Sequence, residues 1–558
     1  MRVHYRTEMK ECPYCHSPLF PYATRHRSVI SAEYGKFEAV EHVMGCIEHG
    51  IFRSDSLSAI VSPHCRYAND VMTESAVKRF IDGRSCSEIA SEFGTGISER
   101  HVRNLSNMAL DIFRDIHNSA SARLREAVGS YVLQIDGTVD SEFSVIIAVR
   151  DAVSKFTLFT GKYRTESHES MRSVIQTVKE KFGVPSGITS DMRSAIISAA
   201  MEVFPGIPIR VCLLHFLRDL GKELMEDVHK DLGMMVNGIG IKSSLRAMLD
   251  TIPKYDSKTL YEIEYRFCTD SEKMEMMAVR RILENLLGTT GSSGYGFPFS
   301  LKHLNFFIAL RETEMKLSDV SRKFTGEQSS YLASQIMGEI RKIAGNPEVN
   351  EKASRLSEIN SLIFQMLRNA FNIPDSGSLS DEMPDDVTVH EKCNTVIGEM
   401  DVYLHSNIPQ HIFKAAKKAV ERYREREHLL FANNEDGTIP RTNNNMETLF
   451  RRVRRNVRKR CGSIATGNIL KQSGDSLVLF QNMDNKKYLE VVFGADYIPS
   501  VFGKHRKRFK REGLSRSRTL KLVDEGIKMM LTDSLYDSPY NDYSMEKAYA
   551  SRNGTTTK

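Results

Sequence analysis

Between residues 131 and 212, short apolar runs alternate with amphipathic segments, and this alternation constrains the fold more than any other feature of the chain. The apolar runs have the length and composition of strands, whereas the longer segments repeat their apolar residues at helical spacing. The predicted order is three antiparallel strands, a helix, a strand, a helix and a fifth strand, at 131–136, 144–149, 156–161, 166–181, 187–190, 194–203 and 207–212. Such an order is typical of an α/β domain with a mixed sheet.

Two carboxylates occupy equivalent points of this pattern. Asp136 is expected to end the first strand, with Gly137 permitting a sharp exit, and Asp191 follows the fourth strand. The order of elements is that of the ribonuclease H-like fold, in which the fourth strand pairs beside the first. The two acids would then lie side by side although 55 positions separate them. A divalent cation such as Mg²⁺ would neutralise their repulsion.

A third carboxylate is expected from RTNNNME, residues 441–447. Thr442 or an asparagine could cap a helix there, and its buried stripe would be Met446, Phe450, Val453 and Val457. Glu447 points away from this stripe, and four arginines follow on its own side: Arg451, Arg454, Arg455 and Arg458. An exposed Glu447–Arg451 ion pair is the alternative interpretation, and Glu427 and Glu435 are alternative acids.

The first 66 residues contain two short metal-ligand spacings. Cys12-Pro-Tyr-Cys15 is followed, after 30 residues, by Cys46-Ile-Glu-His49. Two such knuckles commonly hold one tetrahedral zinc ion, and a small segment with little apolar material needs that ion to fold. His16, His64 and Cys65 are alternative ligands.

Residues 70–126 are predicted to form a helix-turn-helix unit. Ser85 or Ser87 can cap a short helix that Gly94 closes, and Ser98 can cap the longer helix that follows. The longer helix would offer Arg100, Arg103 and Asn104 to the major groove, because arginine and asparagine suit guanine and adenine edges. Three-helix units are also common in proteins that do not bind DNA.

Several of these segments together resemble the insertion-sequence and Mutator-like families of DDE transposases. The likeness lies in IDGT, ITSDMRSAI…FPGIPIRVCLLHF and TNNNMETLFRRVRR, and covers roughly 130–220 and 440–480. The resemblance implies a catalytic triad of Asp136, Asp191 and Glu447, and a Cys212–His215 pair near the active site. Half of a zinc site and a buried structural role are alternatives for this pair. The zinc and helix-turn-helix arrangement is also similar to some members of these families.

The resemblance implies two-metal chemistry on DNA, with two Mg²⁺ or Mn²⁺ ions held by the triad. The protein would cleave double-stranded DNA at the terminal inverted repeats of its element and join the ends to target DNA, with no covalent protein–DNA intermediate. Because two ends must be paired, a homodimer or larger assembly on DNA is expected. Alternatives are a transposase-derived DNA-binding regulator, which needs no metal, and a nuclease of the same fold that cuts without joining.

Charge is distributed unevenly, although the net charge is only +6. The basic blocks RRVRRNVRKR (451–460) and KHRKRFKR (504–511) are typical of phosphate-binding surfaces. The nine cysteines do not indicate a disulfide framework, and no signal peptide or membrane-spanning run is evident, so the protein is expected in the cytoplasm, associated with the nucleoid.

Six regions are predicted along the chain, and the alternation of strands and helices is expected to resume near residue 441. The regions are a zinc-ribbon-like unit (1–66), the helix-turn-helix domain (70–126), the first part of the ribonuclease H-like catalytic domain (127–220), a large all-helical insertion (221–439), the second part of the catalytic domain (440–500) and a basic C-terminal tail (501–558).

Overall fold

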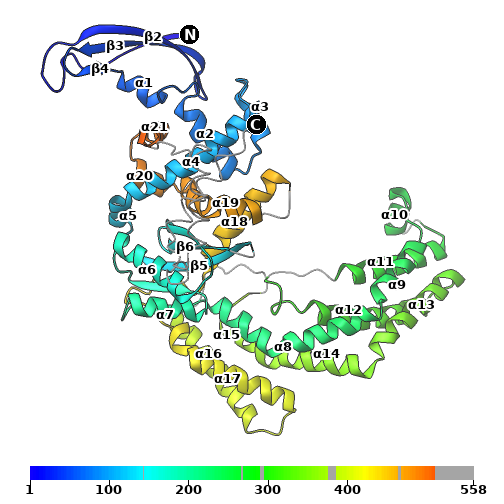
Figure 1. Ribbon diagram of the computed structural model, residues 1–558. Coiled ribbons are helices and arrows are strands. Elements are labelled where there is room, and N and C mark those ends of the chain that lie inside the picture. The colour runs from blue at the N-terminus through cyan, green and yellow to red at the C-terminus, as the bar shows by residue number, and fades with distance from the viewer. Residues whose placement is uncertain (142–143, 266–267, 290–294, 375–384, 463–466, 509–558) are drawn as a thin grey trace, which may run out of the picture. The chain divides into compact units, whose positions relative to one another are not determined.

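A computed structural model of the chain describes residues 1–558 except 142–143, 266–267, 290–294, 375–384, 463–466 and 509–558 (Figure 1). The fold is mixed α/β and mostly helical, with two mixed sheets. By its contacts the chain divides into two units, one of Met1–Ala127 with Arg451–Lys558 and one of Val128–Phe450. The six regions expected from the sequence are finer than this division. The boundary after Phe450 also falls inside the region 440–500, which was expected to complete the catalytic domain.

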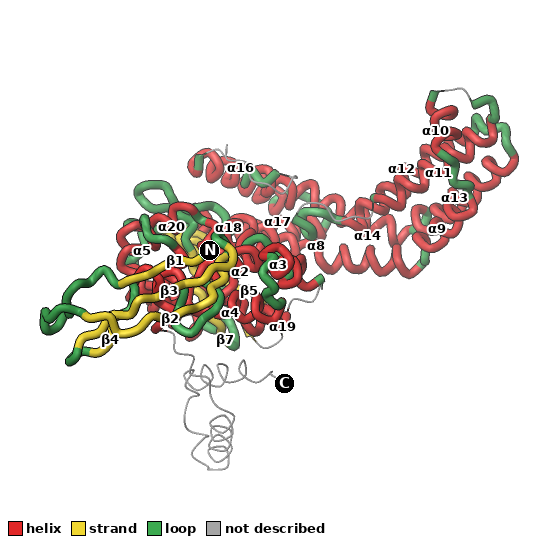
Figure 2. Tube along the Cα trace, turned by 90° about the horizontal axis from the view of Figure 1, so that it is seen from above, coloured by secondary structure: helices red, strands yellow, loops and turns green. Residues whose placement is uncertain are grey.

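The first unit begins with a four-stranded sheet. Its strands are β1 (Arg2–Arg6), β2 (Phe20–Ser31), β3 (Gly35–Cys46) and β4 (Gly50–Phe52). Figure 2 shows β1, β3 and β2 side by side; β1 runs parallel to β3, whereas β2 and β4 pair with β3 in the antiparallel sense. One face packs on helix α1 (Asp55–Ile60), so that Val29, Phe37 and Leu57 form a small core.

Three helices follow, at α2 (Asn69–Phe80), α3 (Cys86–Phe93) and α4 (Glu99–Ser119). The caps of the last two confirm their prediction. Ser85 and Glu88 form a reciprocal capping box, Gly94 ends α3 in the left-handed conformation, and the Ser98 side chain accepts the His101 N–H. Val102, Leu105 and Ala109 are buried on the inner face of α4.

The C-terminal part of this unit is helical where the structure describes it, so the return to strands expected in 440–500 is wrong for those residues. Its elements are the end of α18 (Asn444–Cys461), α19 (Gly467–Phe480), a 3₁₀ turn (Gln481–Asp484), α20 (Lys486–Phe493) and α21 (Ile498–Arg508). Helices α19 and α21 pack against α4, and Phe113 of α4 contacts the rings of Phe480 and Phe502. Most of the predicted tail, 509–558, lies outside the described residues.

The second unit contains the five-stranded sheet predicted at 131–212. Helix α5 (Ser121–Val128) belongs to the first unit except for its last residue. The second unit continues with β5 (Val132–Ser141), β6 (Ser144–Asp151), β7 (Thr157–Tyr163), α6 (His168–Phe182), β8 (Gly187–Ser190), α7 (Ser194–Val203) and β9 (Ile209–Val211). The strand order is β7-β6-β5-β8-β9. β5, β6 and β7 form an antiparallel meander, and β8 runs parallel to β5, so the predicted pairing of the fourth strand beside the first is confirmed.

The prediction that β5 ends at Asp136 is wrong. Asp136 pairs with Ala148 in mid-strand, and the ladder with β6 continues beyond it through Gly137 and Thr138. Gly137 therefore makes no sharp exit. A Cβ atom at this position would collide with the carboxylate of Glu166, so the glycine makes room for a side chain that packs onto the strand.

Only helices occur in the described part of 213–430. They are α8 (Leu213–Gly238), α9 (Ile241–Thr251), α10 (Ser257–Glu264), α11 (Ser271–Gly288), α12 (Lys302–Ser321), α13 (Glu327–Ala344), α14 (Pro347–Ile359), α15 (Gln365–Ala370), α16 (Asp386–Leu404) and α17 (Gln410–Leu430), with a π-helical turn at Asn360–Phe364. One continuous apolar core joins all of these helices except α10 to the end of β9. The chain thus leaves the sheet at β9 and returns to it after α17.

Candidate functional site

Asp136 and Asp191 come to the same level of the sheet in the second unit. The last β5–β8 pair joins Gln134 to Thr189, and each acid lies two residues beyond its member of that pair. Adjacent parallel strands therefore deliver both carboxylates to one place. Both residues are buried, with exposed fractions of 8% and 6%.

Glu447 joins these two acids from the first turn of α18. Its charge is among those that raise the pKa of Asp136, and its Oε1 lies 3.4 Å from Nη1 of Arg218 and 3.5 Å from Nε2 of His215. The alternative acids have other surroundings. Glu427 bonds to His390 at 2.6 Å between α17 and α16, and Glu435 is exposed in the loop that follows α17.

The surroundings raise the pKa values of two of these acids. Burial, together with repulsion from Asp191 and Glu447, raises the pKa of Asp136 to about 7. Burial, with a contribution from Asp219, raises the pKa of Asp191 to about 6. Such a carboxylate group is stabilised by an added positive charge, and oxygen ligands suit Mg²⁺ or Mn²⁺.

Sequence reasoning missed a fourth carboxylate and a cation at this place. Arg193 pairs with both Asp191, at 3.0 Å, and Glu166, which precedes α6. Oε1 of Glu166 is buried and has no hydrogen-bond partner among the described residues. The carboxylate of Glu166 lies over Gly137, where a Cβ atom would require it to move.

A buried ion network fixes the chain where it returns to the sheet. Arg210 of β9, only 1% exposed, donates to both carboxylate oxygens of Asp386 at 2.7 and 2.8 Å and to the carbonyl of Ile439 at 3.2 Å. Arg441 donates to Asp386 as well, at 2.5 Å. Although burial alone would raise it, the pKa of Asp386 is lowered by these two guanidinium groups. The network anchors the start of the segment that carries Glu447.

Cys212 and His215 lie at the beginning of α8. Burial raises the pKa of the Cys212 thiol to about 11, so this sulfur is protonated in the absence of a metal. Burial also lowers the pKa of His215, whose Nε2 faces Glu447 while its Nδ1 is buried without a partner among the described residues. His215 is therefore a neutral imidazole that lies beside Glu447, the third acid.

In the first unit, the four predicted zinc ligands come together, so this part of the prediction is confirmed as a possible metal site. Their ligand atoms all lie within 4.8 Å of one another. Separations are 3.5 Å for Cys12 Sγ–His49 Nδ1, 3.5 Å for Cys15 Sγ–Cys46 Sγ and 3.8 Å for Cys46 Sγ–His49 Nδ1. A tetrahedral ion with metal–sulfur bonds of about 2.3 Å requires ligand separations of about 3.7 Å.

The chemistry of this group also fits zinc. Hydrogen bonds from the side chain and backbone of Ser17 lower the pKa of Cys15 to about 6, which favours the thiolate that a metal needs. The surrounding apolar cluster is small, with Leu19, Met44 and Phe52 as members. The alternative ligands His16, His64 and Cys65 are not part of the group.

The residues predicted to bind DNA occupy two helices of the first unit. Arg100, Arg103 and Asn104 are exposed on the first turns of α4. On α18, Arg451, Arg455 and Arg458 are exposed and Arg454 is half-buried, while Val453 and Val457 are buried as predicted. Four cations of α18 also border a pocket of about 830 Å³: Arg452, Arg455, Arg458 and Lys459.

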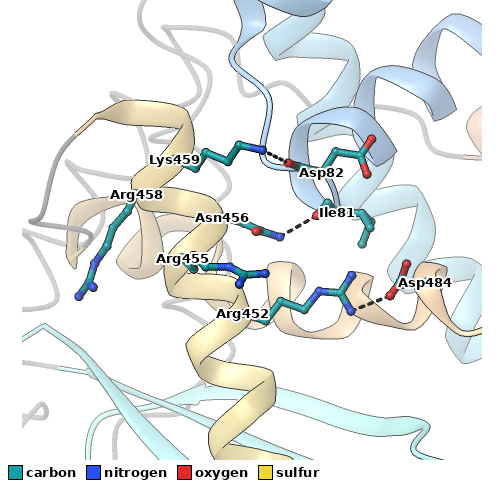
Figure 3. A pocket seen from close by; sticks show the side chains of 8 residues that line it. All are labelled: Ile81, Asp82, Arg452, Arg455, Asn456, Arg458, Lys459 and Asp484. Atoms are coloured by element: carbon teal, nitrogen blue, oxygen red, sulfur yellow. Dashed lines mark hydrogen bonds and ion pairs between the residues drawn. The ribbon is translucent and has the colours of Figure 1, made fainter. Parts of the chain in front are cut away.

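Figure 3 shows how α18 is held at this pocket. Nδ2 of Asn456 donates to the carbonyl of Ile81 at 2.8 Å, and Lys459 donates to the carbonyl of Asp82 at 3.0 Å. These bonds satisfy carbonyl groups at the end of α2. Arg452 pairs with Asp484 at 2.7 Å. The basic helix and the three-helix segment 69–119 therefore belong to one packed body.

No protein-family model matches this chain, and a comparison with curated proteins found no match. Within the described residues, no helix is long and apolar enough to cross a membrane.

Proposed function

We propose that the protein is a DDE-type DNA transposase, with a ribonuclease H-like catalytic domain interrupted by the helices α8–α17. The observation that carries this proposal is the convergence of Asp136, Asp191 and Glu447 on one end of the β5–β8 pair. The strand order β7-β6-β5-β8-β9 supports the fold assignment. The resemblance of IDGT, the segment around Asp191 and TNNNME to insertion-sequence and Mutator-like transposases supports the activity.

The three acids fit a pair of Mg²⁺ or Mn²⁺ ions, because they offer only oxygen ligands and because burial makes their uncompensated charge unfavourable. When bound, such ions would activate the attacking water or DNA 3′-hydroxyl and stabilise the leaving 3′-oxygen. Asp136 and Asp191 would hold them from rigid strands, and Glu447 from a helix. This division keeps the acids preorganised, which in-line phosphoryl transfer requires.

The cations beside the acids have a part in the same proposal. Arg193 and Arg218 would bind the non-bridging oxygens of the phosphate that is cut, since guanidinium groups match phosphate geometry. Arg100, Arg103 and Asn104 would read base edges in the terminal repeats. The arginines of α18 would hold the DNA backbone, and a zinc ion at Cys12, Cys15, Cys46 and His49 would stabilise the N-terminal sheet. We expect at least a dimer on DNA.

A cleavage and joining assay tests the proposal. The DNA that flanks the gene on both sides is placed on a plasmid and incubated with purified protein and Mg²⁺, and wild type is compared with Asp191→Ala. Metal-dependent cuts at the flanks, with joined products that the variant does not form, are expected. Cutting without joining would favour a nuclease. Binding of these DNAs without cutting would favour a regulator and would contradict the transposase assignment.

A further inference from the structure

Cys212 connects the strand of Asp191 to the segment that carries Glu447. It begins α8 directly after β9, and its backbone N–H donates to the carbonyl of Ser190, the neighbour of Asp191, at 2.9 Å. Its Sγ accepts the backbone N–H of Asn443 at 3.3 Å. The residue after Cys212 adds a further link, because the N–H of Leu213 donates to the carbonyl of Arg441 at 2.9 Å.

Asn443 connects the strand of Asp136 to Glu447. Its side-chain Nδ2 donates to the carbonyl of Ile135, the neighbour of Asp136, at 3.2 Å. This carbonyl lies one residue beyond the last β5–β8 pair, so the asparagine amide extends that ladder. The Asn443 carbonyl accepts the N–H of Glu447 at 3.4 Å and begins α18.

We propose that Cys212 and Asn443 are positioning residues that together fix the spacing of Asp136, Asp191 and Glu447. Cys212 is bonded to the neighbour of Asp191, and Asn443 is bonded to the neighbour of Asp136 and to Glu447. The bond between Cys212 and Asn443 connects these two sets. For the role of the three acids, the inference rests on the proposed function. The hydrogen bonds of Cys212 and Asn443 do not depend on that function.

Stability alone does not explain an asparagine at this position. Asn443 is completely buried, and its Oδ1 has no partner among the described residues, which is unfavourable relative to a satisfied group. An apolar residue would avoid that cost but would lose the bond to Ile135. Cys212 is also fully enclosed, and its protonated sulfur suits a hydrogen-bond acceptor for Asn443.

The test measures binding of Mn²⁺ alone to the full chain by calorimetry, together with amide hydrogen exchange of residues 441–447 without metal. The variants are Asn443→Ala, Cys212→Val, which keeps the shape but lacks an acceptor, and Cys212→Ser, which keeps an acceptor. Asn444→Ala, one position along, is the matched control. Replacing a residue that holds a metal ligand in place typically lowers the affinity for the metal by about 10–100-fold.

We expect Asn443→Ala to weaken Mn²⁺ binding about 10–100-fold and Cys212→Val about 10-fold, each with faster exchange of the Glu447 amide. Cys212→Ser should restore binding to within about threefold of wild type, and Asn444→Ala should leave it unchanged. Rescue by serine separates positioning from general loss of structure, and it remains informative if Asn443→Ala does not fold.

Wild-type affinity and wild-type exchange in Cys212→Val would overturn the inference. Failure of the proposed function is a different result: wild-type protein would bind Mn²⁺ in a manner that depends on Asp191 but would not cut DNA. If Mn²⁺ binding did not depend on Asp191 at all, faster exchange at Glu447 in Cys212→Val, restored by serine, would still support the positioning role.

Discussion

The two candidate metal sites are built in opposite ways. Cys12, Cys15, Cys46 and His49 come from two short turns within 38 residues of one another, and the apolar cluster around them is small. Asp136, Asp191 and Glu447 come from two strands and a distant helix within a unit that has its own large core. A metal ion at the first site would stabilise the fold around it. The fold around the second site would form without a bound metal. Soft thiolates suit the first role, and hard, mutually repelling carboxylates suit the second.

The largest expected effect concerns the thiolate site. Cys46→Ala should lower the zinc content from one ion per chain to near zero and unfold the N-terminal sheet, because structural zinc in small units contributes about 10–16 kcal/mol. Metal analysis and limited proteolysis between residues 1 and 66 measure both changes. Cys65→Ala is the control, since Cys65 is a thiol of the same unit outside the group. A folded, zinc-free Cys46→Ala protein would break the comparison.

The second largest expected effect is a loss of activity in a protein that stays folded. Glu447→Gln should lower metal-dependent DNA cleavage by at least about 1,000-fold, because one ligand of the ions is lost, while the circular dichroism spectrum stays unchanged. The matched control is Glu427→Gln, the alternative acid, which pairs with His390 in the helical segment. If Glu447→Gln and Glu427→Gln cleaved DNA at the same rate, the assignment of Glu447 would be refuted.

The third effect concerns pH and stability in the absence of metal. The pKa of Asp136 is raised from 3.8 to about 7 in the folded state, so the folded state favours the protonated acid and stability falls as pH rises between these values. Asp136→Asn imitates the protonated form. It should therefore stabilise the protein prepared without Mg²⁺ or Mn²⁺ by roughly 1–3 kcal/mol at pH 8 and by less at pH 5.

Thermal denaturation at the two pH values measures this difference. A destabilised Asp136→Asn protein at pH 8 would mean that burial and the neighbouring acids do not raise the pKa of Asp136 in the metal-free state. Cys46→Ala should not gain stability at either pH. This result would distinguish a site whose acids repel one another from a site on whose metal folding depends.

The smallest effect concerns the basic helix. Replacing Arg455 and Arg458 together by alanine should weaken DNA binding similarly for all sequences and reduce the slope of log affinity against log salt by about 2, because two phosphate contacts are lost. Arg281→Ala with Arg322→Ala removes the same charge from exposed sites in the helical segment and should change the slope little. An effect confined to one DNA sequence would contradict a phosphate role.

The sequence by itself determined most local structure and the residues from which both sites are built. Capping residues such as Ser85, Gly94 and Ser98 fix their helices through contacts a few positions away. The thiolate group could be predicted for the same reason, since its ligands lie on short turns. The order of elements along the chain followed from the alternation between 131 and 212, and the antiparallel meander from its short connections. The pairing of the fourth strand beside the first was expected only because this order is that of the ribonuclease H-like fold.

Only the tertiary structure decided how the long-range parts meet. It placed Glu447 rather than Glu427 beside the strand acids, and it brought Glu166 and Arg193 to the same place. It also extended β5 past Asp136 and assigned most of α18 to the unit of the N-terminal helices. These outcomes depend on buried pairs such as Arg210–Asp386 and Cys212–Asn443, whose members are more than 170 positions apart. No local pattern encodes such a pair, because its energy exists only when both partners are removed from water together.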